Sequence, residues 1–122
     1  MECNNKAEVG SWGEQQAREY LVQKGYCILE TNWHDSHREI DIIASKGDDI
    51  VIVEVKTRTS TFMNPIDAVN KQKQKLLIAA ANYYVKKNHI DKNVRFDIIS
   101  IVATNGEIQL EHIENAFYPI VW

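Results

Sequence analysis

The strongest constraint in the sequence is a pair of apolar runs, 39–44 and 50–57, separated by Gly47 and Asp48. Both runs are rich in β-branched residues, and Gly-Asp is typical of a tight turn, so the sequence predicts a β-hairpin. Each run carries apolar side chains on both of its faces. We therefore expect a sheet that other elements cover on both sides.

The rest of the chain predicts the element order α-β-β-β-α-β-β. The expected elements are a helix at 12–24, strands at 26–32, 39–44 and 50–57, a helix at 70–88, and strands at 94–102 and 108–113. Loops are expected at 33–37 and 59–69. Asn70 is a plausible helix cap, Asn64-Pro65 is a competing helix start, and Asn105-Gly106 predicts a hairpin turn. The order predicts an α/β domain with a mixed sheet flanked by helices.

Length and composition favour one ordinary globular domain over residues 1–122, with a flexible N-terminus at 1–8. The chain has 122 residues, 44% hydrophobic and 25% charged, which excludes disordered and collagen-like classes. Cys3 and Cys27 belong to no metal-binding spacing, so we expect two reduced thiols. Because no apolar run is long enough to span a bilayer and the first residues do not form a signal peptide, we expect a cytoplasmic protein without a membrane partner.

The charges are segregated along the chain. The formal net charge is −3, yet the stretch 56–95 holds nine Lys or Arg and two Asp. Such segregation predicts a basic face that can meet a phosphate backbone, although a solvated lysine-rich helix would give the same pattern. The candidate phosphate contacts are Arg58, Lys71, Lys73 and Lys75.

The hairpin also carries acids within its apolar runs. If the turn consists of Gly47 and Asp48, Asp41 faces Glu54 on the neighbouring strand. Two carboxylates about 5 Å apart repel by roughly 3 kcal/mol at an effective dielectric near 20. A divalent cation would reverse the sign of that interaction, since Mg²⁺ takes one or two carboxylates with waters and a phosphate oxygen. The pair therefore predicts a site for Mg²⁺ or Mn²⁺.

Lys56 lies two residues after Glu54, on the same side of the strand. Its ammonium group can orient a nucleophilic water or neutralise developing charge, so the combination is typical of phosphodiester hydrolysis. The alternative is that both are ordinary exposed positions of a half-solvated strand. The same register places Glu39 opposite Lys56, where it either supports the acids or pairs with Lys56 or Arg58.

The ordered set of residues resembles the PD-(D/E)XK nuclease superfamily, with its restriction-endonuclease-like core. More closely, it is similar to the YraN family of small bacterial proteins, which are related to archaeal Holliday junction resolvases. The matching stretches are Gly10, Gly13-Glu14, Ala17, Tyr20-Leu21, Gly25, Asn32, Glu39 to Ile43, Val53 to Arg58, Pro65, Ala68-Val69, Lys73, Leu77, Ala81, Tyr84, Arg95 to Asp97 and Ala116-Phe117.

This resemblance implies a metal-dependent DNA endonuclease of the resolvase or repair kind. Asp41 and Glu54 would hold Mg²⁺ or Mn²⁺, Lys56 would assist the attacking water, and Glu14 would bring a further acid to the same metal. It also implies a DNA partner, branched or damaged, and a homodimer. The alternatives are a nucleic-acid-binding module that keeps the fold without cutting, and a protein-interaction domain with a salt-bridged acidic surface.

Several further residues permit two interpretations. His34 and His37 are spaced like a metal pair, but in a loop solvated histidines are the better interpretation. Asp97 is expected at a polar edge of the sheet. Aromatic residues that could stack on unpaired bases are Trp12, Trp33, Tyr83 and Tyr84, of which Tyr84 is expected in the core and Trp12 as an anchor for the first helix.

Overall fold

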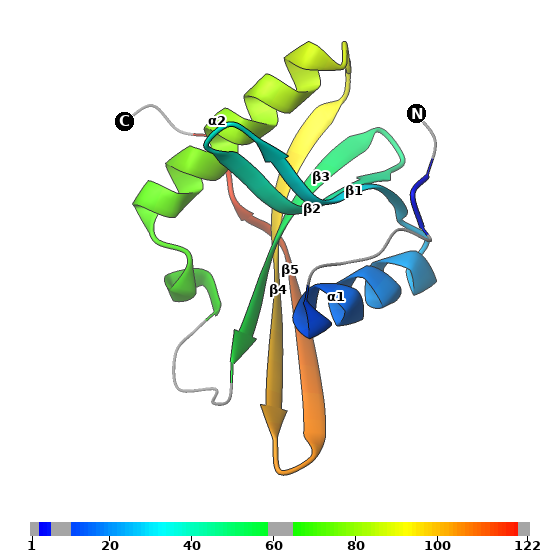
Figure 1. Ribbon diagram of the computed structural model, residues 1–122, viewed down its shortest axis with the longest axis vertical. Coiled ribbons are helices and arrows are strands. Elements are labelled where there is room, and N and C mark those ends of the chain that lie inside the picture. Colours follow the sequence, from blue (N-terminus) through cyan, green and yellow to red (C-terminus); the bar gives the residue numbers. More distant parts are fainter. Residues whose placement is uncertain (1–2, 6–10, 59–64, 120–122) are drawn as a thin grey trace.

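The computed structural model describes residues 3–5, 11–58 and 65–119 (Figure 1). Its elements are α1 (Trp12–Gln23), β1 (Cys27–Asp35), β2 (Arg38–Lys46), β3 (Asp49–Arg58), the 3-10 helix η1 (Pro65–Ala68), α2 (Lys71–Lys87), β4 (Asn93–Thr104) and β5 (Glu107–Phe117). The predicted order of helices and strands is confirmed. The structure adds η1 inside the segment predicted as irregular, of which 59–64 lie outside the described residues.

The five strands form one mixed sheet in the order β1-β2-β3-β4-β5. Neighbouring strands are antiparallel except β3 and β4, which run parallel. A parallel pair needs a long crossover connection, and η1 and α2 supply it here. The expected α/β fold is confirmed and is consistent with a restriction-endonuclease-like core.

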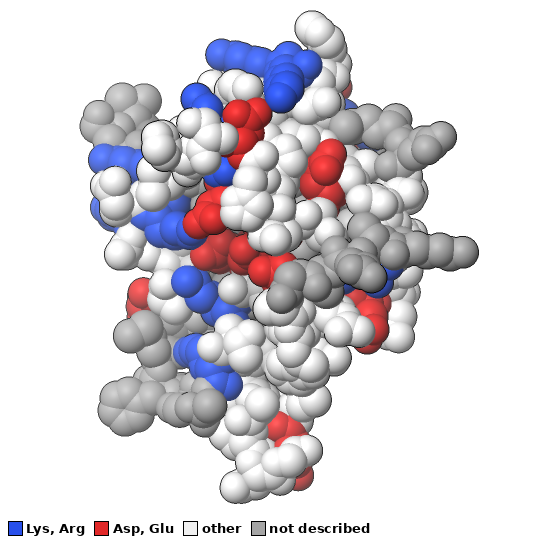
Figure 2. Space-filling model, viewed as in Figure 1, with Lys and Arg blue, Asp and Glu red and all other residues white. Residues whose placement is uncertain are grey.

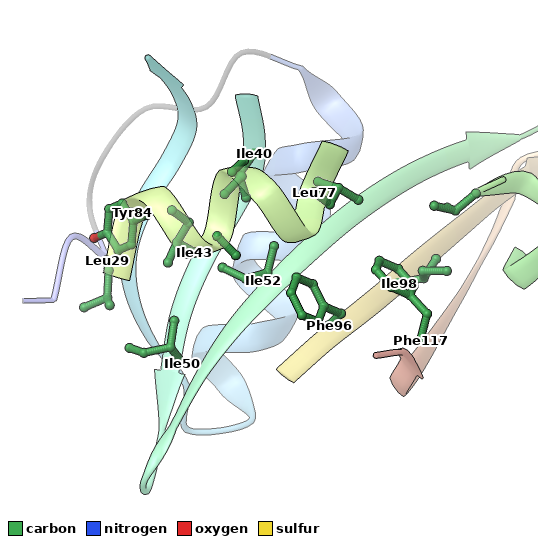
Figure 3. Close-up of a cluster of buried hydrophobic side chains, with 13 residues drawn as sticks. Leu29, Ile40, Ile43, Ile50, Ile52, Leu77, Tyr84, Phe96, Ile98 and Phe117 are labelled. Atoms are coloured by element: carbon green, nitrogen blue, oxygen red, sulfur yellow. The ribbon is translucent and has the colours of Figure 1, made fainter. Parts of the chain in front are cut away.

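One helix packs on each face of the sheet, because the inner strands alternate apolar side chains between two layers (Figure 1). On β3, Ile50 and Ile52 belong to the cluster that contains Leu77 and Tyr84 of α2 (Figure 3). Val51 and Val53 belong to a second cluster, with Ala17 and Leu21 of α1. The doubly covered sheet that the apolar runs predict is therefore present.

Local signals in the sequence explain where elements begin and end. Ser11 caps α1, since its side chain accepts a hydrogen bond from the Glu14 backbone N–H at 3.1 Å. Asn70 caps α2 in the same way, by accepting from the Lys73 backbone N–H at 2.9 Å. Gly25 follows α1 with φ of +89°, a conformation that glycine adopts without strain.

The first strand is longer than predicted. Trp33, His34 and Asp35 continue β1 rather than forming a loop, and only Ser36 and His37 remain as the turn to β2. The sequence does not predict this end of β1 because its side chains are largely polar. They are polar because one face of the β1–β2 hairpin is exposed there. An irregular register at Leu29 also breaks the simple alternation on which the prediction rested.

The expectation of two reduced thiols is wrong in this structure. Cys3 and Cys27 form a disulfide, with Cα atoms 5.1 Å apart. The segment 3–5 lies against the outer edge of β1, where the backbone N–H of Asn4 donates to the Ile28 carbonyl and the Asn5 side chain accepts from the Ile28 N–H. Cysteine spacing alone does not reveal this contact, because it depends on pairing with a strand more than 20 residues away. The other predicted N-terminal positions lie outside the described residues.

Candidate metal centre

The predicted hairpin register is confirmed by the pairing of β2 with β3. Ile42 lies opposite Val53 and Ile43 opposite Ile52, so the next pair in the same count is Asp41 and Glu54. The ladder of paired residues stops just before these acids. There the Asp41 side chain accepts a hydrogen bond from the Val55 backbone N–H at 2.8 Å. A carboxylate thus replaces the β2 backbone as the partner of β3, and the strands begin to separate at the acidic pair.

Glu54 is almost fully buried, with 5% of its surface exposed. Burial, followed by the neighbouring charge of Asp41 and a hydrogen bond with its side chain, raises the pKa of the Glu54 carboxyl group to about 7, against the lowering effect of Lys73 and Lys56. Near neutral pH the pair therefore holds a proton for part of the time. A divalent cation would take the place of that proton, so these two carboxylates fit a Mg²⁺ or Mn²⁺ site completed by water and phosphate oxygens.

Two lysines approach the same carboxylate from different elements. Lys56 Nζ lies 3.5 Å from Glu54 Oε2, and Lys73 Nζ of α2 lies 3.8 Å from that atom. Glu54 and Lys56 continue the series of β3 side chains that face α2, which explains why a lysine of the first turn of α2 can reach them. The sequence predicts Lys73 as a flanking phosphate contact, but the structure brings it directly to the acidic pair.

Glu14 lies in the first turn of α1, at the end of the helix that packs against β3. Gly13 allows this close packing, because a Cβ atom at this position would overlap with Thr57 Oγ1. The described residues contain no cluster of three or more His, Cys, Asp or Glu side chains placed to hold a metal ion. The structure thus brings Asp41 and Glu54 together and does not add Glu14 to them as a third ligand.

The other predicted phosphate contacts lie on β3 and α2. Arg58 donates a hydrogen bond to the Ser100 hydroxyl of β4 at 3.0 Å, and Lys71 and Lys75 are exposed on α2. Figure 2 shows Asp and Glu atoms gathered in the middle of one face, with Lys and Arg atoms beside them. A strand of nucleic acid approaching this face would therefore meet cations next to acidic side chains.

The structure corrects the expectations for Glu39 and for the element that carries His34, whereas His37 is exposed in the turn as expected. Glu39 is paired with His34 across β1 and β2, with Oε2 3.5 Å from His34 Nδ1, and it faces neither Lys56 nor Arg58. The hairpin register does not extend to Glu39, because the β2–β3 ladder ends at Ile42. His34 lies in a strand rather than in a loop.

Asp97 is fully buried rather than at a polar edge. It accepts hydrogen bonds from Arg95 at 2.8 and 3.0 Å, pairs with His112 Nε2 at 2.7 Å, and accepts from the Asn115 backbone N–H at 3.1 Å. Burial opposes ionisation of this carboxyl group, but the bonds from His112 and Arg95 outweigh it and lower the pKa. Arg95 and Asp97 two residues apart on one strand share a face, a signal that could have predicted their pairing.

The aromatic residues divide between core and surface. Tyr84 is buried as expected, and its hydroxyl donates to Glu30 Oε2 at 3.3 Å. Trp33 packs edge-on against Tyr84 with ring centroids 5.5 Å apart, and Trp12 is 44% exposed. No helix in the described part of the chain is long and apolar enough to cross a membrane.

Comparison with known proteins gives a consistent family match. The model described as "Uncharacterised protein family UPF0102" matches residues 13–101. A UPF0102 protein of Phocaeicola vulgatus is 45% identical over 116 residues, an alignment that covers 94% of this chain and 96% of the relative. A UPF0102 protein of Flavobacterium psychrophilum is 49% identical over 112 residues, covering 91% of this chain and 94% of the relative. These names assign no activity.

Proposed function

The chain belongs to the uncharacterised protein family UPF0102, the YraN family, and on that premise we propose that it is a metal-dependent endonuclease acting on DNA. The observation that carries the proposal is the pair formed by Asp41 and buried Glu54, where β2 separates from β3 beside two lysines. A purely structural role would not need two carboxylates in contact in a site with little solvent.

Asp41 and Glu54 would hold Mg²⁺ or Mn²⁺ through their carboxylate oxygens. The ion would polarise the scissile phosphate and lower the pKa of a bound water. The Val55 N–H fixes one oxygen of Asp41, so that side chain is oriented before any ligand arrives. Burial and its two lysine partners hold Glu54 in place in the same way.

The lysines supply the remaining chemistry. The Lys56 ammonium can hydrogen-bond the attacking water or stabilise charge that develops on the phosphate oxygens. Lys73 can do the same from α2. Their positive charges also reduce the repulsion between the acidic centre and an incoming phosphate backbone. DNA is the proposed partner because Lys71 and Lys75 are exposed on α2, the helix that carries Lys73.

The same contacts favour a second candidate, a nucleic-acid-binding module that does not cut. Lys56 and Lys73 already offset part of the negative charge of Glu54 without a metal ion, so the cluster can also serve as a structural unit. In that case Asp41 would serve only to end the β2–β3 ladder. The two candidates differ in whether Asp41 and Lys56 are required for turnover.

The test is cleavage of labelled DNA with Mg²⁺ or Mn²⁺ by the wild type, Asp41→Asn and Lys56→Met. The panel contains a four-way junction, a flap, a duplex and a single strand, and each variant is first shown to be folded by circular dichroism. The Asp41→Asn side chain keeps an oxygen that can accept from the Val55 N–H, so the effect of this substitution reports the loss of the negative charge. Lys86→Met, at an exposed position near the end of α2, is the matched control.

We expect metal-dependent cutting that each site variant lowers by about 100-fold or more, with the control unchanged. If the wild type cuts no substrate with either metal while Asp41→Asn binds DNA as tightly as the wild type, the endonuclease proposal is wrong and the binding module takes its place.

A further inference from the structure

A pocket of about 320 Å³ lies between the turn that joins β1 to β2 and the first half of α2. Figure 1 shows this turn lying across α2. Residues 36–39 form one wall of the pocket, and Lys73, Leu76 and Leu77 contribute to the other. We call it the hairpin–helix pocket. Its size is at the lower end of the range for small-molecule sites, roughly 300 to 1,000 Å³, which suits one planar ring system.

The lining of the hairpin–helix pocket is apolar on one side and polar on the other. Leu76 is 55% exposed, whereas the neighbouring Leu77 on the same helix is buried. On the hairpin side, His37 and Glu39 offer hydrogen-bonding groups. The Arg38 guanidinium stacks on Tyr83 at 4.1 Å from the ring centroid, which holds it at the rim. An apolar surface beside donors and acceptors is what an unstacked nucleobase requires.

Lys73 connects this pocket with the acidic pair. It lines the pocket, and its ammonium nitrogen lies 3.8 Å from Glu54 Oε2. A group bound in the pocket therefore lies only one side chain away from Asp41 and Glu54. If the scissile phosphate binds at that pair, the neighbouring nucleotide of the same strand reaches the hairpin–helix pocket.

We propose that the hairpin–helix pocket binds one unpaired nucleobase of the DNA strand beside the scissile phosphate. The proposal rests on the proposed function for the position of that phosphate. A base within a continuous duplex is stacked and paired, so it cannot enter a pocket of this size without leaving the helix. The pocket therefore favours DNA with an unpaired nucleotide next to the cleaved bond over an uninterrupted duplex.

The test measures binding in metal-free buffer, so its outcome does not depend on cleavage. Fluorescence anisotropy gives the affinity of the wild type and Leu76→Ala for a single-stranded oligonucleotide and for the matching duplex. Ile108→Ala on β5 is the matched control, since Ile108 is 53% exposed and Leu76 is 55% exposed. A second series replaces one nucleotide at a time by an abasic residue.

We expect Leu76→Ala to weaken binding of the single strand by about tenfold and to leave duplex binding within about twofold. One abasic position should weaken wild-type binding by the same factor and add nothing to the loss in Leu76→Ala. Any of three results would overturn the proposal. Leu76→Ala could weaken binding of the single strand and the duplex equally, or it could bind no more weakly than Ile108→Ala. The wild type could also fail to bind single-stranded DNA. If Leu76→Ala weakens only single-strand binding and the wild type cuts no DNA, the pocket proposal stands and the endonuclease proposal is wrong.

Discussion

At the scale of single residues, Glu54 has an unusual environment for an acidic side chain. It is buried beside another carboxyl group, and two ammonium groups compensate only part of that cost. Removing either lysine would leave a buried acid with less compensation, whereas removing the acid would leave two cations close together. The site is thus a balanced set of charges in which each substitution affects the others.

The first prediction concerns the pH dependence of stability in metal-free protein. Glu54 has a pKa of about 7 when folded and an ordinary value near 4.5 when unfolded, so the folded chain binds more protons between these limits. The free energy of unfolding should therefore fall as the pH rises from about 4.5 to 7, by roughly 2 to 3 kcal/mol. Glu54→Gln should lack this decrease.

Urea unfolding at a series of pH values measures this effect, with EDTA present throughout. Glu111→Gln, at an exposed position of β5, is the control that should keep the wild-type decrease. If the stability of the wild type rises over this pH range, the pKa of Glu54 is not raised in the folded protein.

At the scale of elements, the contact between α1 and β3 sets the position of the acidic centre relative to the first helix. Gly13 packs directly against Thr57, which lies near the end of β3. Only one of the three staggered χ1 rotamers of threonine would direct a hydrogen, rather than a methyl or hydroxyl group, toward an added Cβ atom.

Gly13→Ala should therefore destabilise the fold by about 1 to 3 kcal/mol, even though alanine is the better helix former. Adding Thr57→Ala to the same chain should recover most of the loss, because it removes the colliding hydroxyl. Thermal unfolding of the two single variants and the double variant measures the coupling. A stabilised Gly13→Ala protein would mean that α1 does not pack this closely.

Much of this arrangement can be predicted from the sequence, for identifiable reasons. The Gly47-Asp48 turn fixes the register that joins Asp41 to Glu54, and Asn70 and Gly25 mark helix ends. The approach of Lys73 to Glu54 could not be predicted, because it depends on how a crossover helix lies on the sheet. The disulfide could not be predicted for a similar reason. It depends on pairing of the segment 3–5 with the edge of β1, which leaves no recognisable cysteine spacing in the sequence.

At the scale of the whole molecule, a polar network around buried Asp97 joins elements that are far apart in the sequence. Arg95 of β4 contacts Asp97, donates to the Tyr26 hydroxyl beside β1 and pairs with Glu114 of β5. His112 hydrogen-bonds the Tyr20 hydroxyl of α1 at 3.0 Å. The network therefore fixes α1 and β5 against the central strands on the side opposite α2.

Asp97→Ala should lower the free energy of unfolding by roughly 3 to 5 kcal/mol, because it leaves the partly buried Arg95 and His112 without their shared carboxylate. Asp91→Ala is the control, since Asp91 is exposed in the connection between α2 and β4 and its loss should change stability by less than about 0.5 kcal/mol. Urea unfolding compares the two. Equal effects would show that the network does not stabilise the assembled sheet.

The most direct test of the metal centre is titration of the folded protein with Mn²⁺, in which the electron paramagnetic resonance signal of free Mn²⁺ reports the unbound ion. The wild type should bind one ion per chain, and Asp41→Asn should weaken binding by at least about tenfold while retaining its fold. Absence of bound Mn²⁺ in the wild type, or binding that Asp41→Asn leaves unchanged, would contradict the assignment of Asp41 and Glu54 as a metal site.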